Sequence, residues 1–231
     1  AYWAKAGKLI DFMEKGTAPL VPPIAVGDLE AGSVLAGGVA AALYRQQKTG
    51  KGEKVMISLY GLSIWSLGTM FLGQQCSGMN YPRSRRELPP LVNTYQCKDG
   101  EWILLTMFEW DRFFPVVCEI LGLKALAADP KFADVNTAYD NRDALIPAME
   151  EKFMLRTATE WDELFKQNDV PHSVLTHIKD ILNDEQAKAN CFVYPVTTRT
   201  LGDYYLAAPP IQFGGTFAPD YTPAPLLGEH T

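Results

Sequence analysis

One acidic residue lies at a point in the sequence where a carboxylate meets unusual electrostatic surroundings. The stretch VGDLEAGS places Asp28 directly after Gly27, at the N-terminal edge of a predicted helix. Free amides and the helix dipole stabilise negative charge at such a place. An ionised carboxylate there acts as a base or a nucleophile, or it caps the helix by accepting a hydrogen bond from a first-turn amide. The spacing alone leaves these roles open.

The cysteines and histidines give weaker chemical signals. The four cysteines lie far apart and form no CxxC pair, which argues against a zinc cage or a redox pair. They are Cys76, Cys97, Cys118 and Cys191. We therefore expect no metal site, and we expect reduced thiols, as in a cytoplasmic protein. His172 and His177 flank a short predicted strand, and the sequence assigns them no chemistry.

A loop rich in proline and arginine offers candidate anion-binding groups. The segment YPRSRRELPPLVN carries Arg83, Arg85 and Arg86. Guanidinium groups bind phosphates and carboxylates through paired, charge-assisted hydrogen bonds. These arginines therefore either meet an anionic ligand or form a solvated basic loop, and the sequence leaves both possibilities open.

The composition is that of a globular protein. The chain has 231 residues, 47% of them hydrophobic, and a net charge of −6, which is enough for one large or two small domains with real cores. The acidic balance argues against binding to nucleic acid, which requires clustered lysine and arginine. We find no apolar run of membrane-spanning length and no signal-peptide pattern, so we expect a cytoplasmic protein with no membrane partner.

The helix that follows the VGDLEAGS stretch is rich in small residues. The sequence predicts it over residues 29–48, and its closely spaced glycines need compensation by tight packing against another backbone. A helix over residues 2–14 comes before it, with a proline-rich loop over 19–23 between the two. The turn KTGKGEK comes after it and leads to a predicted strand over 54–59 and an apolar helix over 64–71.

The second half of the chain mixes strands and amphipathic helices. The runs VNTYQ and EWILLTM flank Lys98-Asp99-Gly100, a pattern typical of a β-hairpin. Thr157 and Glu160 have the spacing of a capping box. The other predicted elements are helices over 109–122, 141–153, 157–167 and 178–189 and strands in PHSVLT, CFVYPVT and DYYLAAPPIQF.

The change in composition at the arginine-rich loop suggests a domain boundary. We assign residues 1–80 to part of a large domain and 81–93 to a linker. Residues 94–196 form a small α+β domain, and 197–231 return to the large domain.

Several motifs, in order along the chain, strongly resemble the family III CoA-transferases, the CaiB/BaiF group. They are GDLEAG…GGVAAALYRQQKTGKGEKVMISLYG, NTYQCKDGEWILL followed by WDRFF, and the closing segment APPIQFGGT…PAPLLGEHT. The resemblance covers almost the whole chain. Within the family, YWAKAG, KTGKGEKVMISLY and NTYQCKDGEWI are most similar to enzymes of anaerobes that move CoA among 2-hydroxy and 2-enoyl acids.

The resemblance implies a fold, an assembly and a reaction. The fold is α/β, with part of a Rossmann-like large domain and a smaller α+β domain, in an interlocked homodimer. Asp28 matches the family's aspartate nucleophile, which carries CoA as an aspartyl-CoA thioester. The substrates are acyl-CoA thioesters and small carboxylic acids, and no permanently bound cofactor is required. Leu59 matches an apolar residue that lines the CoA site, although core packing is the other role open to it; Arg83 and Arg85 are candidate CoA contacts.

Two departures from the family pattern bear on these expectations. The chain lacks the N-terminal half that holds most CoA contacts in the family, as well as the final stretch, so we expect it to be a piece of a longer protein. The loop over 81–93 lacks the glycines that cover the site of formyl-CoA transferases, which argues against formyl or oxalyl substrates. A 2-methylacyl-CoA racemase of the same fold, with the aspartate as acid or base, and a non-catalytic homologue remain alternatives.

Overall fold

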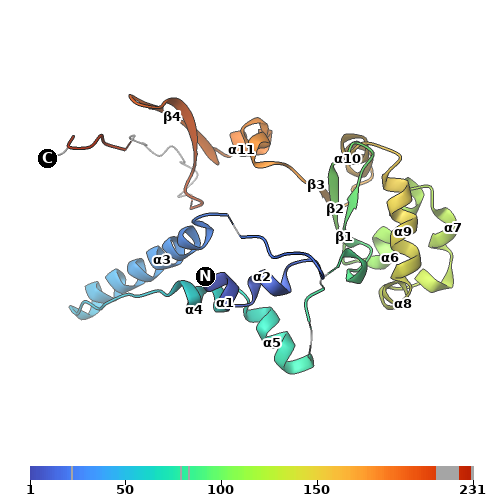
Figure 1. The fold of residues 1–231 in the computed structure, drawn as a ribbon, viewed down its shortest axis with the longest axis horizontal. Coiled ribbons are helices and arrows are strands. Elements are labelled where there is room, and N and C mark those ends of the chain that lie inside the picture. Colours follow the sequence, from blue (N-terminus) through green and yellow to red (C-terminus); the bar gives the residue numbers. More distant parts are fainter. Residues whose placement is uncertain (22, 79, 83, 212–223, 230–231) are drawn as a thin grey trace. The chain divides into compact units, whose positions relative to one another are not determined.

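The computed structural model describes residues 1–21, 23–78, 80–82, 84–211 and 224–229 (Figure 1). The chain divides into two compact units, Ala1–Ser173 and Val174–Thr231. Both helices and antiparallel sheets are present. The domain boundaries expected at residues 81–93 and 197 stay predictions.

The first unit opens with two very short helices, α1 (Tyr2–Lys5) and α2 (Lys8–Asp11). The single helix predicted over residues 2–14 is therefore wrong in its continuity. The break falls at Gly7, whose φ of +90° is left-handed. Glycine adopts this conformation without the steric cost that a Cβ imposes, so the helix ends and restarts there.

The long helix α3 (Val26–Thr49) confirms the predicted small-residue helix and begins three residues earlier (Figure 1). It ends at Gly50, whose φ is +70° and whose N–H donates to the carbonyl of Gln46. This is the usual left-handed C-terminal arrangement. The tight packing against another backbone that was expected for this helix is not seen at the glycines between residues 29 and 48, within the described part of the chain. A Cβ added at Gly38 would lie 3.1 Å from a side-chain atom, Val55 Cγ1, and no described atom beyond the helix's own backbone lies within 4 Å of one added at Gly32 or Gly37.

Helix α3 is also long and apolar enough to cross a membrane, judged by length and composition. The expectation from the sequence that no apolar segment is long enough to span a membrane is therefore wrong. One helix of this kind is weak evidence for a membrane span, because core helices of globular proteins meet the same criterion.

After α3 the chain runs to α4 (Leu59–Trp65) and α5 (Gly68–Ser77). The strand predicted over 54–59 does not form within the described part of the chain. A strand needs a neighbour that completes its backbone hydrogen bonds, and none of the described residues pairs with this segment. The hydroxyl of Ser58 instead caps α4 by accepting from Gly61 N–H at 3.2 Å. The predicted helix over 64–71 falls across the break between α4 and α5.

A three-stranded sheet lies at the centre of the rest of the first unit, with the order β1-β2-β3. The predicted hairpin is confirmed: β1 (Val92–Gln96) pairs antiparallel with β2 (Trp102–Thr106). Gly100 in the connecting turn has a φ of +85°, which suits glycine. The short strand β3 (His172–Val174) joins the sheet beside β2.

Helices pack around this sheet and confirm most of the sequence pattern. They are the α-helices α6 (Trp110–Ile120), α7 (Lys124–Ala127), α8 (Val135–Asp140), α9 (Arg142–Phe153) and α10 (Ala158–Gln167), with the 3-10 helices η1 (Arg85–Glu87) and η2 (Pro130–Phe132). The predicted capping box of α10 is present, with Thr157 and Glu160 bonded to each other's backbone. The core includes Tyr95 and Phe153, both fully buried and stacked with ring centroids 4.6 Å apart.

The second unit holds the remaining elements. The 3-10 helix η3 (Ile178–Asn183) and α11 (Glu185–Ala189) together cover the helical segment predicted over 178–189. Strands β4 (Val193–Thr198) and β5 (Gly202–Ala207) form in the two segments predicted as strands, and they pair antiparallel. The second strand ends at Ala207, so its predicted continuation over residues 208–211 is wrong. The end of the predicted strand DYYLAAPPIQF, residues 212–213, lies outside the described residues.

Candidate functional site

Asp28 lies in the first turn of α3 and is exposed to solvent. It is the third residue of the helix, and Ala25 occupies the N-cap position. Among the described residues, no side chain makes a capping hydrogen bond to this helix. The N-cap role that the sequence left open for Asp28 is therefore wrong, and its carboxylate is available for other interactions.

The start of α3 is strained as well as uncapped. Ala25 has a φ of +64°, in the left-handed region, which costs a non-glycine residue on the order of 1–3 kcal/mol. Only from Leu29 onward do amides bond back along the helix, Leu29 N–H donating to Ala25 O at 2.9 Å. The earlier amides of a helix have no intrahelical acceptor. They and the helix dipole favour negative charge at Asp28 or beside it.

The residue before Asp28 is held in a close contact with α1. Gly27 is buried, and a Cβ built on it would overlap the Tyr2 hydroxyl and lie 2.6 Å from Cε2 and 2.7 Å from Cζ of that ring. Real Cβ atoms essentially never make contacts under 3.0 Å. Position 27 therefore requires glycine while Tyr2 keeps this place, and the sequence pattern gave no sign of this contact.

Leu59 is the first residue of α4 and is half-buried. The helix it begins packs against both α1 and α3. Its predicted role as a residue that lines the CoA site stays a prediction.

The arginine-rich loop is bound to the small sheet and α9. Arg85 donates to the carbonyl of Thr94 and to the carboxylate of Glu150, and its guanidinium lies 5.1 Å from the ring centroid of Trp102. Arg86 pairs with the other oxygen of Glu150 at 2.6 Å. Arg83 lies outside the described residues. CoA binding by Arg83 and Arg85 stays a prediction, and for Arg85 it requires release from Glu150 or a ligand that reaches past it.

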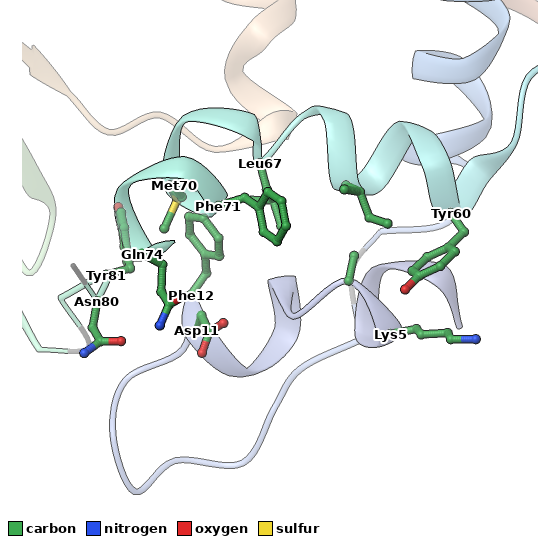
Figure 2. A pocket seen from close by; sticks show the side chains of 12 residues that line it. Lys5, Asp11, Phe12, Tyr60, Leu67, Met70, Phe71, Gln74, Asn80 and Tyr81 are labelled. Atoms are coloured by element: carbon green, nitrogen blue, oxygen red, sulfur yellow. The ribbon is translucent and has the colours of Figure 1, made fainter. Parts of the chain in front are cut away.

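A pocket of about 680 Å³ lies between the two short N-terminal helices and the helices α4 and α5 (Figure 2). Its volume is in the range of small-molecule sites. The lining residues are Lys5, Ala6, Asp11, Phe12, Tyr60, Ile64, Leu67, Met70, Phe71, Gln74, Asn80 and Tyr81. Among the described residues that line it, neither Asp28 nor Leu59 nor Arg85 is present, so the pocket and the predicted site residues do not coincide. Sequence reasoning missed the pocket because its walls come from separate short helices.

The four thiols fall into a buried pair and an exposed pair. Burial, with Asp99 and Glu101 nearby, raises the pKa of the Cys97 thiol to about 11, and burial raises the pKa of Cys118 to about 12. Cys76 and Cys191 are exposed, and all four thiols are free. In the described part of the chain, no group of three or more histidine, cysteine or acidic residues is arranged to hold a metal ion.

Comparison with known proteins assigns the chain to a family. The chain belongs to CoA-transferase family III, whose family model matches residues 2–231. It is 35% identical to the (R)-2-hydroxy-4-methylpentanoate CoA-transferase of Clostridioides difficile, covering 100% of this chain and 58% of that protein. It is 32% identical to the cinnamoyl-CoA:phenyllactate CoA-transferase of Clostridium sporogenes, covering 100% of this chain and 57% of that protein. The chain thus spans a little over half the length of these relatives.

Solved structures share the fold. Rv3272 from M. tuberculosis, in its orthorhombic form, matches with a TM-score of 0.82 and 20% identity, over 99% of this chain and 60% of that one. A CAIB/BAIF family protein from Brucella suis matches with a TM-score of 0.79 and 23% identity, over 99% of this chain and 59% of that one. The expected α/β fold of family III CoA-transferases is therefore confirmed.

Proposed function

We propose that the full-length protein is an acyl-CoA:carboxylate CoA-transferase and that Asp28 is its nucleophile. The observation that carries the proposal is the exposed carboxylate of Asp28 in the uncapped first turn of α3, in a chain that matches family III along its whole length. A capping aspartate would be engaged with the helix amides, and Asp28 is not.

The reaction balances without a metal or a redox group. The Asp28 carboxylate attacks the thioester carbonyl of the donor acyl-CoA, and the C–S bond breaks to give a mixed anhydride and CoA thiolate. The thiolate attacks the aspartyl carbonyl, which releases the donor acid and leaves an aspartyl-CoA thioester. The acceptor carboxylate attacks this thioester, forming a second anhydride and thiolate, and the thiolate takes the acceptor acyl group and restores Asp28.

The start of α3 suits the electrostatics of these steps. Negative charge moves between the carboxylate, the tetrahedral oxyanions and the thiolate, always close to Asp28. First-turn amides and the positive end of the helix dipole stabilise such charge without reorganisation during the reaction. Both anhydride intermediates react with water, so the assembled site has to exclude it between half-reactions.

The proposed substrates are 2-hydroxy and 2-enoyl acids and their CoA thioesters. The names of the two relatives above, a 2-hydroxy-4-methylpentanoate enzyme and a cinnamoyl-CoA:phenyllactate enzyme, support this class. The lack of glycine over residues 81–93 argues against formyl and oxalyl groups. We also propose a cytoplasmic homodimer that binds neither nucleic acid nor membrane and holds no permanent cofactor. Leu59, Arg83 and Arg85 are its proposed CoA contacts.

A trapping experiment on the full-length protein tests the nucleophile. The enzyme is incubated with a 2-enoyl-CoA such as cinnamoyl-CoA, quenched with hydroxylamine, and digested for mass spectrometry. We expect a hydroxamate on the peptide that contains Asp28. Asp28→Asn should lose both the label and the transfer activity, since the covalent route is removed. Glu30→Gln, which changes a neighbouring carboxylate on the same helix, should keep both.

Two outcomes would refute the proposal. One is turnover without any label on the Asp28 peptide. The other is exchange of the α-proton of a 2-methylacyl-CoA with solvent deuterium at a rate that disappears in Asp28→Asn, which would identify a racemase in which the aspartate acts as an acid or base.

A further inference from the structure

We infer that Tyr2 is a positioning residue for Asp28: its ring, pressed against Gly27, fixes the first turn of α3 and thereby the direction of the nucleophile. The inference rests on the proposed function and gives a role to a residue that the sequence analysis left without one. Its basis is the contact in which the Tyr2 ring occupies the space where position 27 would carry a side chain.

The first turn of α3 needs support from elsewhere in the fold. Among the described residues no side chain caps it, and it is entered through Ala25 in a left-handed conformation. A strained backbone persists only where surrounding contacts hold it in place. The Tyr2 ring supplies such a contact one peptide unit before Asp28, and Gly27 is buried beneath it.

Tyr2 lies on α1, and that helix is held by contacts with α2 and α4. The Tyr2 ring meets Trp3 edge-on with centroids 6.4 Å apart, and the ammonium group of Lys8 lies 4.7 Å from a Trp3 ring centroid. Lys5 on the same helix lies 5.0 Å from the ring centroid of Tyr60, at the start of α4. The Tyr2 ring thus lies as a wedge between α1, which α2 and α4 hold in place, and the first turn of α3 at Gly27.

If the Tyr2 ring positions Asp28, its loss should lower the reaction rate and have little effect on substrate affinity. A displacement of about 1 Å in a reacting group lowers rates by on the order of 100-fold. Loss of the ring should therefore slow formation of the Asp28 adduct by roughly 10–100-fold. The KM for acyl-CoA should change by no more than about threefold, because Tyr2 acts through Gly27 and not on the CoA thioester.

The test is a double-mutant cycle at Tyr2 and Gly27 in the full-length enzyme. The variants are Tyr2→Phe, Tyr2→Ala, Gly27→Ala and the Tyr2→Ala/Gly27→Ala pair. Each is mixed with cinnamoyl-CoA, and hydroxylamine trapping gives both the rate and the final extent of labelling at Asp28. Tyr2→Phe keeps the ring and should react within about twofold of wild type. Tyr2→Ala and Gly27→Ala should both react slowly, the first by removing the wedge and the second by colliding with it.

The double variant Tyr2→Ala/Gly27→Ala distinguishes loss of positioning from partial unfolding. Once the ring is absent, the Gly27→Ala methyl group has space, so the pair should be no slower than Tyr2→Ala alone, which is the non-additivity expected of residues in contact. Loss of positioning lowers the rate of labelling at Asp28 but leaves its final extent complete. Partial unfolding lowers the final extent. If Tyr2→Ala does not fold, Gly27→Ala alone tests the inference. A wild-type rate of labelling in Gly27→Ala then overturns it.

The remaining outcomes distinguish the two proposals. Wild-type enzyme without a label at Asp28 refutes the proposed function, and the inference falls with it. Labelled wild type together with a Tyr2→Ala variant that labels equally fast refutes the inference alone. So does a Gly27→Ala penalty that is the same with and without the ring.

Discussion

The imidazole Nε2 of His172 lies 3.0 Å from Oδ1 of Asp162, and its Nδ1 lies 2.7 Å from the carbonyl oxygen of Val170. Both neighbours carry acceptor oxygens, and the tautomer of the ring decides which nitrogen donates. The other carboxylate oxygen of Asp162 accepts from Lys166 at 2.7 Å. Asp162 thus joins α10 to strand β3 through its hydrogen bond to a buried ring.

Removing that carboxylate should destabilise the fold. Asp162→Ala leaves a buried ring nitrogen without its acceptor, and hydrogen bonds to charged groups contribute about 1.5–3 kcal/mol. We expect a loss of this size in the free energy of unfolding, measured by urea titration. Glu163→Ala, which removes the adjacent exposed acid on the same helix, should change it by less than about 0.5 kcal/mol. Equal effects of the two substitutions would contradict the role of the Asp162–His172 contact.

The same carboxylate should make stability depend on acid pH. Burial acts to raise the pKa of Asp162, but hydrogen bonds from Lys166 and His172 outweigh it and lower the pKa overall. A pKa that is lower in the folded than in the unfolded state gives stability that is present above the ordinary aspartate pKa of about 4 and is lost as the pH falls through the folded value. Urea midpoints measured between about pH 5 and 2 should fall less steeply in Asp162→Asn than in wild type. A steeper fall in the variant would mean that folding raises the pKa of this carboxyl group.

Two phenylalanines in the first unit should differ sharply in their contribution to stability. Phe153 is 0% exposed and packs against the rings of Tyr95, Trp161 and Phe165, whereas Phe108 is 83% exposed. Phe153→Ala should lower the free energy of unfolding by about 3–5 kcal/mol through lost burial and a residual cavity. Phe108→Ala should stay within about 0.5 kcal/mol of wild type. Thermal melts with denaturant titration measure both, and a large loss at Phe108 would mean that this ring is covered in the assembled protein.

Glu150 should control how firmly the arginine-rich loop is held. Its two carboxylate oxygens pair with Arg85 and Arg86, and Arg142 donates to the carbonyl of Arg86 at 3.0 Å. Glu150→Gln weakens both ion pairs while keeping the size of the side chain. Trypsin should then cut after Arg85 and Arg86 several-fold faster, as followed by mass spectrometry. Glu119→Gln, which removes an exposed pair with Lys124, is the control, and equal cleavage rates in the two variants would argue against a role of Glu150 in holding the loop.

The cysteines should divide into two classes of reactivity. The thiolate is the reactive form, and burial keeps Cys97 and Cys118 as neutral thiols, with pKa values of about 11 and 12. Iodoacetamide at about pH 8 should modify the exposed Cys76 and Cys191 first. The two buried thiols should react only after unfolding in urea. Early modification of Cys97, detected by peptide mapping, would show that the hairpin opens.

Features determined by neighbouring residues could be predicted from the sequence. The hairpin around Gly100 and the capping box of Thr157 and Glu160 depend on chemistry within a few residues, and both are present as predicted. The small-residue helix was also found within three residues of its true start. The error of three residues matters, however, because the true start at Val26 moves Asp28 from the predicted N-cap position into the first turn of the helix.

Features determined by distant residues could not be predicted. The segment over 54–59 has strand-forming residues, but a strand exists only with a partner, and the described chain offers it none. The partner of Arg85 is 65 residues away, and the ring that covers Gly27 comes from α1, which α2 and the proline-rich loop separate from Gly27 in the sequence. No local pattern of residues specifies such contacts, since they arise only when separate elements pack.

The separation between Arg85 and Glu150 also sets an order of events during protein synthesis. Ribosomes add about 5–20 residues per second, so the loop emerges roughly 3–13 seconds before the carboxylate that will hold it, 65 residues later. During that interval the two guanidinium groups of Arg85 and Arg86 have no access to Glu150, and the nascent chain presents them to the surrounding solvent. The loop therefore reaches its final place only once α9 has left the ribosome and folded.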